Sequence, residues 1–582
     1  MKKSMMYSSV ANPGRRNFFK TGVAATGTLL VSSKAAQAQV APIIPPSPAT
    51  TPWVQSLPVY TPKQAVDGAL SPPAAGARLE SSGECGRDNH QAWGQFPPLK
   101  FYELRVSAAQ HQFHPEYPTQ TIWGYDGITP GPLFHARYGE PIVVRIHNDL
   151  PATLQGPGSP ETATHLHNLH TPSTSDGFPG NYYSATQHGP TLSAPGGFQD
   201  YHYPNVYAGV DEYGGIGDPR EGLGTLWYHD HRMDFTAPNG LRGLAGFYLL
   251  FDHIDSGNEL DPSLTALRLP SGKYDVPIIF GDRRFDSGGL LFWDPFSPEG
   301  VLGDKVVVNG KIEPFFKVAR RKYRLRLLNG GPTRFYEFYL VTPGNVVQSF
   351  TYIANDGNLL PKPLLNQTRV RLGVAERGDI VVDFSKYPLG TELYLVNRLR
   401  QDDTRGPKDV RAPGTRIMKI IVDRDVPVNE PDMSQVPPDL RELPPLPTAA
   451  EMALLPVRRF EFGRKNGLWT VNDQLFNVNS ARVKVKKGSG EIWELVNLSG
   501  GWSHPIHIHF EEGRILSRTA NGISVPIPAH ELGRKDVYEL NKTSSVRLFM
   551  RFRDFTGRYV MHCHNTVHED HAMMLRWDIE DD

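Results

Sequence analysis

Residues 562–573 read HCHNTVHEDHAM, and this stretch says more about the fold and chemistry of the chain than any other. It contains one of the two cysteines in a chain of 582 residues. Its potential metal ligands are His562, Cys563, His564, His568 and Met573. A thiolate, imidazoles and a weakly bound thioether form the ligand set of a blue-copper electron-transfer site. Because the histidines on either side of the cysteine can serve a second metal centre, the cysteine could join two copper centres through a few covalent bonds.

Three further histidine clusters precede this stretch. They are His165-Leu166-His167, His229-Asp230-His231 and the segment HPIHIH, which contributes His504, His507 and His509. Residues i and i+2 of a β-strand point to the same face, so an H-x-H pair on a strand presents two imidazoles side by side. One H-x-H pair alone is weak evidence of a metal site, and a histidine-rich tract can bind metal unspecifically. Four spaced clusters, one of them centred on a cysteine, favour a built site for several copper ions.

The chain resembles the multicopper oxidase family. That family's four ligand motifs appear in its order as HLH, HDH, HPIHIH and HCHNTVHEDHAM. The phrases IWGYDGITPGP, LWYHDHRM, GLAGFYLL and LPSGKYDVPII are most similar to the bacterial spore-coat laccase and bilirubin oxidase branch. The motifs are specific for copper chemistry with dioxygen as the electron acceptor, and they do not specify the reducing substrate.

The resemblance implies four copper ions with defined ligands. The blue, or type 1, copper would be held by His504, Cys563 and His568, with Met573 as the axial ligand. The type 2 copper would be held by His165 and His507. The two type 3 coppers would be held by His167, His229 and His564 and by His231, His509 and His562. An axial methionine, where other members carry Leu or Phe, predicts a lower reduction potential than theirs.

Reduction of dioxygen to two waters also requires protons. Asp176 and Glu569 match acidic residues of the family near the copper cluster, and we expect both to relay protons. Asp176 stands in the turn-like sequence Ser175-Asp176-Gly177, so it could instead cap its own backbone.

The rest of the chain is patterned as β-strands. Residues 546–552 alternate with period two, and long helical patterns are nearly absent. A weak repeat occurs three times, in which a turn is followed by an alternating strand that ends at asparagine. Its copies are Asp126-Gly127 with Ile142–Asn148, Asn309-Gly310 with Tyr323–Asn329, and Asn472-Asp473 with Ile492–Asn497. The pattern predicts an all-β fold of three cupredoxin-like Greek-key sandwich or barrel domains.

The repeat and the histidines also suggest domain boundaries. We expect a first domain at residues 39–255 with a Pro-rich arm to about residue 100, and a second at 256–425. The third, at 426–582, would begin with a Pro-rich linker to residue 456. No histidine occurs between His253 and His504, so the second domain should carry no copper. The first and third domains must then meet, because each supplies half of the copper cluster.

The N-terminal residues 1–38 read as a twin-arginine signal peptide. Arg15-Arg16-Asn17-Phe18-Phe19-Lys20 precedes an apolar run at 21–31 and the cleavage site Ala36-Gln37-Ala38. A membrane anchor is the alternative, but the run is too short to span a bilayer. We therefore expect twin-arginine export to the periplasm and a mature protein without a membrane span, beginning near Gln39.

The net charge and the cysteine content bear on the binding partners and on disulfide formation. The formal net charge is zero, which gives no indication of nucleic acid or an anionic membrane as a partner. Cys563 as a copper ligand cannot form a disulfide, so Cys85 should be an unpaired thiol with no role. Nothing in the sequence requires more than a monomer.

Three functions remain open from the residues and the resemblance. The first is a laccase-like oxidase of phenols, aromatic amines or tetrapyrroles, whose substrate approaches the edge of His568. The second is a metal oxidase of Mn(II) or Cu(I), and the third a non-enzymatic periplasmic cupredoxin-fold protein. Asn168 stands where the family usually has Gly, and His170 and His571 are extra histidines, expected to lie at the surface or behind the ligands.

Overall fold

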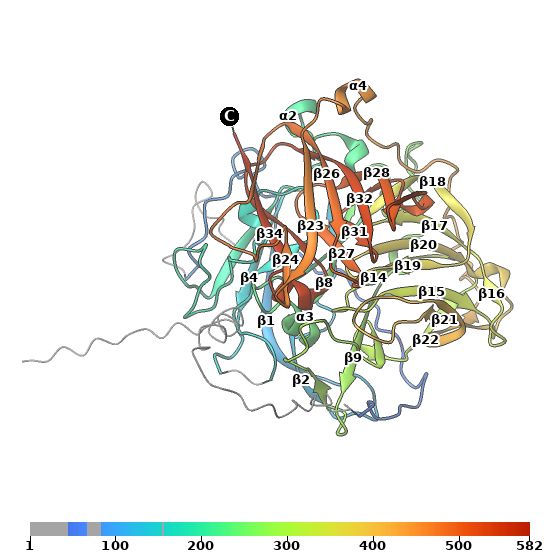
Figure 1. Cartoon of the computed structure of the whole chain (residues 1–582). Helices are drawn as coiled ribbons and strands as arrows, with labels where there is room; N and C mark the ends of the chain where they lie inside the picture. The colour runs from blue at the N-terminus through green and yellow to red at the C-terminus, as the bar shows by residue number, and fades with distance from the viewer. Residues whose placement is uncertain (1–44, 67–82, 154–155, 582) are drawn as a thin grey trace, which may run out of the picture. The chain divides into compact units, whose positions relative to one another are not determined.

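Three pairs of β-sheets follow one another along the chain (Figure 1). The computed structural model describes residues 45–66, 83–153 and 156–581, and the predicted signal peptide lies outside them. The strands of the three pairs fall within residues 100–251, 275–424 and 457–580. The predicted all-β, cupredoxin-like fold is confirmed, and the predicted boundaries near residues 255 and 425 fall between the pairs.

The first pair consists of two four-stranded sheets, ordered β2-β1-β4-β6 and β3-β8-β7-β5. Their strands are β1 (Lys100–His111), β2 (Gln120–Tyr125), β3 (Phe134–Arg137), β4 (Ile142–Asn148), β5 (Thr164–Leu166), β6 (Phe198–Tyr203), β7 (Thr225–Asp230) and β8 (Ala245–Phe251). Leu104, Val144 and Tyr248 belong to one buried apolar cluster, so the two sheets of the pair enclose a common core.

The middle pair has sheets ordered β12-β11-β9-β14-β20-β17-β18, with β10 beside β9, and β13-β22-β21-β15-β16, with β19 beside β15. Its strands are β9 (Asp275–Phe285), β10 (Leu291–Phe292), β11 (Lys305–Val308), β12 (Lys311–Ile312), β13 (Phe315–Ala319), β14 (Lys322–Asn329), β15 (Tyr336–Val341), β16 (Val347–Gln348), β17 (Phe350–Asn355), β18 (Asn358–Gln367), β19 (Val370–Leu372), β20 (Arg377–Asp383), β21 (Glu392–Leu399) and β22 (Val410–Arg424). These strands enclose a core of their own.

The last pair has sheets ordered β24-β23-β26-β32-β28-β29, with β30 beside β28, and β25-β34-β33-β27-β31. Its strands are β23 (Val457–Lys465), β24 (Leu468–Val471), β25 (Val483–Lys486), β26 (Ser489–Asn497), β27 (His504–Ile508), β28 (Gly513–Ala520), β29 (Ile523–Val525), β30 (Arg534–Lys535), β31 (Val537–Leu540), β32 (Ser544–Phe552), β33 (Gly557–Cys563) and β34 (Met574–Glu580). Cys563 and Met573 are both part of this pair's core.

The predicted repeat has the same structure in each pair. The repeat strands β4, β14 and β26 each pair in parallel with the first strand of their pair, which is β1, β9 or β23. The two turn residues have positive φ in all three copies, as a type I′ turn requires. The terminal asparagines Asn148, Asn329 and Asn497 each donate to backbone carbonyls and accept from the amide two residues on. Asparagine therefore ends each strand by fixing the loop that follows.

Helices are short and few in the described part of the chain. The α-helices are α2 (Val210–Tyr213), α3 (Thr236–Arg242), α4 (Ala449–Met452) and α5 (Thr566–Asp570), and the 3-10 helices are η3 (Ser173–Ser175), η4 (Pro219–Glu221), η5 (Gly272–Tyr274), η6 (Phe384–Lys386) and η7 (Ala529–Glu531). The side chain of Asn565 accepts from the amide of Val567 and so begins α5. The carboxylate of Asp570, at the end of α5, accepts from the first two amides of α3. The two helices are thereby fixed to each other.

The described parts of the two Pro-rich segments contact the sheet pairs. Within 46–66, Ser56 forms a bridge to Phe315 of the middle pair, and Pro62 forms one to Leu133 next to β3. In the segment between β22 and β23, Arg441 pairs with Asp252 at 2.7 Å. The N-terminal segment therefore contacts the middle and first sheet pairs, and the later segment contacts the end of the first pair.

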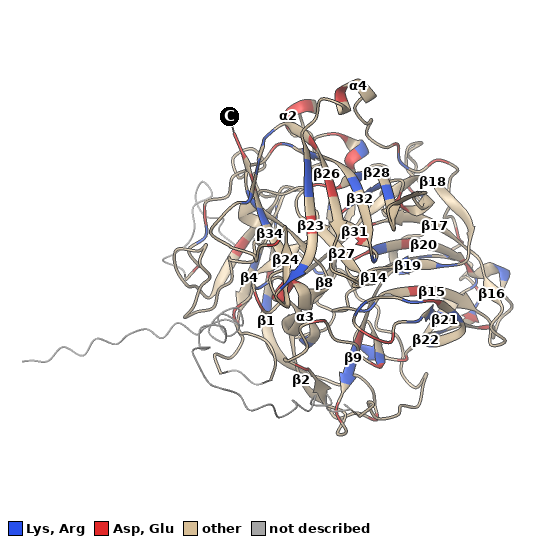
Figure 2. Cartoon of the chain, viewed as in Figure 1, with Lys and Arg blue, Asp and Glu red and all other residues tan. Residues whose placement is uncertain are grey.

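Basic and acidic side chains occur in all three sheet pairs. Figure 2 shows both signs spread over the described elements, although single strands such as β14 and β32 carry basic side chains only. No helix within the described residues is both long and apolar enough to cross a membrane.

Candidate metal centre

The first ligand group is a buried triangle in the last sheet pair. Nδ1 of His504 lies 3.3 Å from Sγ of Cys563 and 3.2 Å from Nδ1 of His568, and the third side measures 3.7 Å. His504 begins β27, Cys563 ends β33 and His568 is carried by α5. All three side chains are fully buried. The structure thus brings together the three side chains assigned to the blue site.

The outer nitrogens of the two imidazoles are held by neighbours. Nε2 of His504 lies 2.9 Å from Oγ of Ser499, and Nε2 of His568 lies 3.0 Å from the carbonyl oxygen of Glu299. A proton on each outer nitrogen leaves Nδ1 as the free lone pair inside the triangle. Met573 is fully buried in the same core as Cys563, and its carbonyl accepts from the Cys563 amide at 3.0 Å.

One expectation about this triangle is wrong. The edge of His568 was expected to meet the substrate, yet the side chain has no exposed surface. The indole of Trp469 covers the imidazole at a ring-centroid distance of 3.8 Å, and Glu299 from the middle sheet pair covers its outer nitrogen. The loop bearing Glu299 lies far away in sequence, so its position could not be inferred from the ligand motif.

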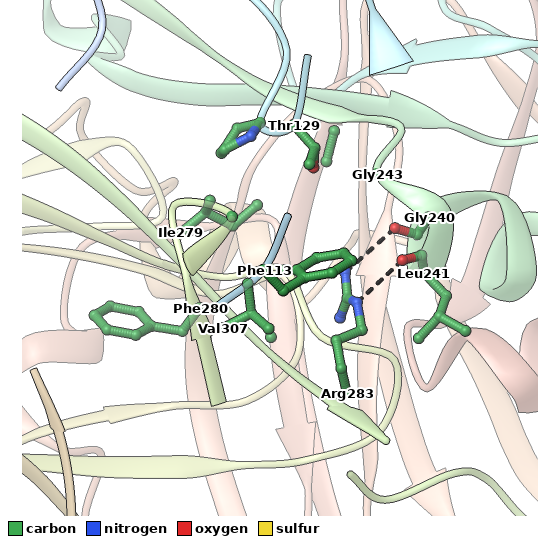
Figure 3. A pocket seen from close by; sticks show the side chains of 14 residues that line it. Phe113, Thr129, Gly240, Leu241, Gly243, Ile279, Phe280, Arg283 and Val307 are labelled. Atoms are coloured by element: carbon green, nitrogen blue, oxygen red, sulfur yellow. Dashed lines mark hydrogen bonds between the residues drawn. The ribbon is translucent and has the colours of Figure 1, made fainter. Parts of the chain in front are cut away.

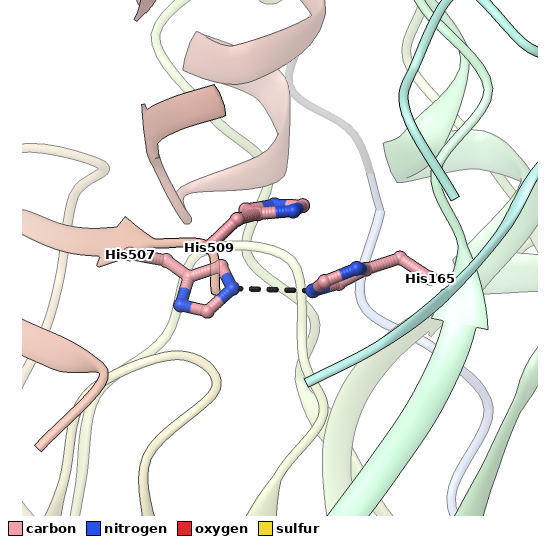
Figure 4. A group of neighbouring side chains, drawn as sticks. All are labelled: His165, His507 and His509. Carbon is pink, nitrogen blue, oxygen red and sulfur yellow. Dashed lines mark hydrogen bonds between the residues drawn. The ribbon is translucent and has the colours of Figure 1, made fainter. Parts of the chain in front are cut away.

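The second ligand group contains eight histidines, four from the first sheet pair and four from the last. Strand register sets them in pairs, because His165 lies opposite His229 between β5 and β7 and His507 lies opposite His562 between β27 and β33. Potential ligand atoms converge in the trios His167, His229 and His564; His231, His509 and His562; and His165, His507 and His509. In Figure 4, His165 points toward His507, and their Nε2 atoms are 3.3 Å apart.

Carboxylates and carbonyls surround this group. Nδ1 of His509 lies 2.8 Å from Oδ2 of Asp176, whereas Nδ1 of His165 lies 2.5 Å from the Asp176 carbonyl oxygen. Glu569 lies 3.0 Å from Nδ1 of His562 and 3.4 Å from Nδ1 of His231. Acceptors on Nδ1 direct the free Nε2 lone pairs toward one another, which is the arrangement of metal-binding imidazoles. Asp176 is thus a partner of the cluster rather than only a turn residue.

The arrangement of the donor atoms suits metal binding better than hydrogen bonding among the imidazoles. Nε2 of His167 lies 3.1 Å from Nε2 of both His229 and His564, and one proton cannot satisfy three facing lone pairs. Burial lowers the pKa of nine of these imidazoles below the ordinary value: His165, His167, His229, His231, His504, His507, His509, His564 and His568. Neutral imidazoles with convergent lone pairs are what a metal site requires. Burial also raises the pKa of the Cys563 thiol, so a bound cation is needed to favour its thiolate.

Cys563 connects the two groups. Its side chain belongs to the triangle, while His562 before it and His564 after it belong to the trios. Successive residues of a strand face opposite sides, which is how one stretch serves both groups. The shortest covalent route between the groups is therefore the backbone on either side of Cys563.

Asp536 also contacts the cluster, although no sequence motif marks it. Its Oδ2 lies 3.1 Å from Nδ1 of His167, and its carbonyl oxygen lies 2.9 Å from Nδ1 of His507. Arg377 of β20 pairs with the Asp536 carboxylate at 2.7 Å, and both side chains are fully buried. The middle sheet pair, which supplies none of the grouped histidines, therefore supports two of them through Arg377. Only the fold shows this, because the two residues are remote in sequence.

The two carboxylates expected to handle protons have different surroundings. Burial raises the pKa of Asp176 well above its ordinary value. Burial also tends to raise the pKa of Glu569, but the imidazoles of His562 and His231 beside it hold that pKa below the ordinary value. The hydroxyl of Thr236 donates to Glu569 at 2.6 Å. Asp176 therefore has the higher affinity for a proton and Glu569 the lower.

Small cavities lie around Arg283. One of about 30 Å³ is beside the eight-histidine group and is lined by residues including His229, His564 and Arg283. A second, of similar size, shares Arg283 with it and is shown in Figure 3, where Arg283 donates to the carbonyls of Gly240 and Leu241. A volume of this size can hold a water molecule. Nδ1 of His564 has no hydrogen-bond partner among the described residues, so it offers such a water a contact.

The additional residues near the motifs have structural roles. Asn168 adopts φ 48°, a left-handed conformation that asparagine tolerates better than most residues, which accounts for its replacing the usual glycine. His170 is buried and pairs with Asp554 at 2.7 Å, and His571 contacts the carbonyl of Val567 at the end of α5. Cys85 is a buried free thiol whose Sγ lies 3.6 Å from Oε1 of Gln199.

Known proteins have sequences similar to this chain. Family models described as multicopper oxidase match residues 107–194 and 450–582. The chain is 33% identical over 485 residues to bilirubin oxidase of Albifimbria verrucaria, covering 82% of this chain and 76% of that protein. It is 31% identical over 529 residues to laccase of Bacillus subtilis (strain 168), covering 83% and 94%.

Solved structures agree on the fold. A laccase from Pediococcus acidilactici aligns with TM-score 0.68 and 23% identity over 92% of this chain and 95% of that one. A multicopper oxidase from Campylobacter jejuni, described as a metallo-oxidase, aligns with TM-score 0.64 and 17% identity over 93% and 99%. With the sequence relatives and the two ligand groups, they lead to one conclusion: the chain belongs to the multicopper oxidase family, copper-dependent oxidoreductases that use dioxygen as electron acceptor.

Proposed function

We propose that this protein is a laccase-like oxidase that couples four one-electron oxidations of an organic reductant to reduction of dioxygen to two waters. The observation that carries the proposal is the position of Cys563, whose side chain lies in the triangle and whose neighbours lie in the eight-histidine group. This arrangement suits an enzyme that accepts electrons singly at one place and uses them together at another. The complete ligand set disfavours a non-enzymatic role.

We assign four copper ions to these ligands. The triangle would hold one type 1 copper, with Met573 as the axial ligand. His165 and His507 would hold the type 2 copper, and the trios centred on His167 and His231 would hold the two type 3 coppers. When bound there, copper supplies the one-electron redox steps and the site of dioxygen reduction.

The protein's own residues supply order and protons. Ser499, Glu299, Asp176, Asp536 and Glu569 accept from the imidazoles that they contact, which holds those rings in one tautomer with the free lone pairs directed inward. Each turnover consumes four protons along with four electrons. The carboxylates of Asp176 and Glu569 contact histidines of the cluster. We propose that these two carboxylates relay the protons.

An organic reductant is favoured over a metal ion. Within the described residues, every group of three or more possible His, Cys, Asp and Glu ligands falls in the two clusters already described. The carboxylate of Glu299, the residue that covers His568, is already paired with Arg464 at 2.8 Å. Phenols, aromatic amines or tetrapyrroles are therefore the proposed substrates. Oxidation of Mn(II) or Cu(I) is the second candidate, favoured by the structural similarity to the Campylobacter jejuni metallo-oxidase.

The proposal includes export. The twin-arginine motif within residues 1–38 supports a periplasmic location, reached through the twin-arginine machinery, and a monomeric mature protein remains our expectation. Membrane and periplasmic fractions of a producing cell, probed for the mature N-terminus, would test both the route and the cleavage site.

Dioxygen consumption tests the catalytic proposal. The copper-loaded protein would be given a dimethoxyphenol, bilirubin, Mn(II) or Cu(I) in separate reactions. Turnover with the organic compounds is the expected result, accompanied by a blue absorption band. Turnover with a metal ion alone would transfer the assignment to metal oxidation.

A further inference from the structure

A groove of about 720 Å³ contains no residue of either ligand group in its lining. It lies between α2, α4, the start of β26 and the end of β32, near the top of Figure 1. Pro445, Leu446 and Pro447, which precede α4, form part of its wall. A volume of this size can accommodate a small organic molecule.

A smaller cavity of about 20 Å³ adjoins this groove. The two share Phe549, Arg551 and Arg553 in their linings. The smaller cavity is also lined by Arg514 and Arg534. Guanidinium groups therefore gather where the groove meets the smaller cavity.

Two of these arginines carry buried N–H groups without an acceptor. Arg553 and Arg534 expose only 7% and 4% of their surface. Nη1 of Arg553 and both Nε and Nη2 of Arg534 have no hydrogen-bond partner among the described residues. Nη2 of Arg553 donates to Glu511 at 2.6 Å and to Glu221 at 2.9 Å, and Nη1 of Arg534 donates to Glu512 at 2.9 Å. The guanidiniums are thus held in place, while unpaired buried donors remain costly until an acceptor binds.

Positive charge exceeds negative charge around the smaller cavity. Four arginines and three glutamates line it. Burial raises the pKa of Glu512 to about 8, so this carboxyl is mostly protonated at neutral pH. Burial tends to raise the pKa of Glu221 too, but Arg534 and Arg553 hold it below the ordinary value. Two carboxylates therefore face four guanidiniums, which favours binding of an anion.

The acidic side chains of the larger groove are engaged elsewhere. The carboxylate of Asp554 pairs with His170 at 2.7 Å. The carboxylate of Glu451 caps the start of α4. Asp211 lies 3.5 Å from Nζ of Lys487. These contacts leave the arginines as the groups available to a ligand.

We propose that this groove binds a small organic anion, whose carboxylate or phosphate contacts Arg551, Arg553 and Arg534. Guanidinium groups recognise the oxygens of both anions through paired N–H donors. The apolar part of the ligand packs on Leu446 and Phe549, and its burial favours an organic anion over an inorganic one. The inference goes beyond the proposed oxidase function and does not depend on it.

Calorimetry with the copper-loaded protein tests the ligand class. Naphthoate and naphthyl phosphate are the probes, and the tighter of the two identifies the preferred anionic group. At least one should bind at or below millimolar concentration. Naphthylmethanol, which lacks the charge, and inorganic phosphate, which lacks the apolar part, should each bind at least about tenfold more weakly. If neither probe binds at millimolar concentration, the inference is wrong.

The arginines are tested by Arg551→Gln. The substitution removes a charge from the groove and leaves no buried carboxylate unpaired, since Nη2 of Arg551 donates to the carbonyl of Pro445. Binding of the better probe should weaken about tenfold, and added salt should weaken wild-type binding more than binding to the variant. Arg547→Gln is the matched control, because Arg547 is exposed on the same strand and lines neither cavity.

Arg553→Lys is a second variant, which keeps the charge and loses the paired donors. It should weaken binding by a similar factor. Should this buried substitution prevent folding, Arg551→Gln still decides the question. Wild-type affinity in Arg551→Gln would overturn the assignment of the site.

Hydrogen exchange locates the bound probe. The better probe should slow exchange in residues 444–455 and 549–554 of the copper-loaded protein and leave residues 562–573 unchanged. Protection centred on residues 562–573 instead would overturn the inference. Turnover of a dimethoxyphenol, measured on the same sample, separates the two proposals. A protein that turns over without binding either probe contradicts this inference alone, and one that binds a probe but oxidises nothing contradicts only the oxidase function.

Discussion

The two ligand groups differ in how much of the chain each one needs. The triangle of His504, Cys563 and His568 lies wholly within the last sheet pair, on β27, β33 and α5. The eight-histidine group is shared equally between the first and last pairs and is supported by Arg377 of the middle pair. One group therefore depends on local strand geometry and the other on how three sheet pairs pack. Substitutions should separate them, since a local defect can spare the shared group and a packing defect can spare the triangle.

Cys563→Ser should give the largest effect and act on the triangle. A serine hydroxyl does not replace a thiolate as a blue-copper ligand, so the blue band should vanish and turnover should fall at least a thousandfold, roughly. The eight-histidine group should keep its copper. Metal analysis with absorption spectroscopy measures both. A residual blue band would show that the assignment of Cys563 is wrong.

Arg377→Met should break the shared group. It leaves Asp536 buried without its counter-charge, which costs about 3–5 kcal/mol of folding stability. Asp536 would no longer hold His167, so copper should be lost from the eight-histidine group while the blue band persists. Thermal unfolding and copper content per chain test this.

Lys484→Met is the control for that experiment, because it removes an exposed ion pair with Glu580. It should change neither copper content nor the unfolding temperature noticeably. Full copper content in Arg377→Met would mean that the middle sheet pair has no part in holding the site.

Glu569→Gln should slow the reduction of dioxygen without changing the copper content of either ligand group. The amide keeps the contact with Thr236 but cannot carry a proton, so both groups should stay loaded and blue. Reoxidation of the reduced protein by dioxygen should slow about a hundredfold, the usual range for loss of a proton-transfer group. Rapid mixing with dioxygen measures this. Reoxidation at the wild-type rate would remove Glu569 from the proton route.

Met573→Leu should have the smallest effect, and this effect should be limited to the triangle. Removing the weak axial thioether should raise the reduction potential of the blue site while keeping copper at both groups. Turnover should stay within about tenfold of the wild type. Spectroelectrochemical titration measures the potential, and an unchanged or lowered value would exclude Met573 as the axial ligand.

Much of this comparison could be foreseen from residues close together in sequence. The two-residue period of a strand was enough to predict that each H-x-H pair presents both imidazoles on one face. That His165 lies opposite His229, from another pair, depends on the register of β5 with β7. The three asparagine-terminated strands also followed from a short repeated pattern. In each case the information lies within a few residues, because strand geometry is regular.

Long-range contacts were the part that could not be foreseen. Asp536 lies between β30 and β31, and no motif close to it in sequence predicts its contact with His167. The expected open edge of His568 was wrong for the same reason, since Glu299 and Trp469 come from other strands and loops.

The sequence by itself determined the ligand types, their pairing on strands, the repeated β architecture and the family. These depend on residue chemistry and on the period of a strand, both of which are local. Only the tertiary structure decided that Arg377 supports the shared group and that Trp469 and Glu299 cover His568 of the triangle. Such features arise where separately folded sheets pack together, and packing depends on the shape and charge of surfaces that no single stretch of sequence contains.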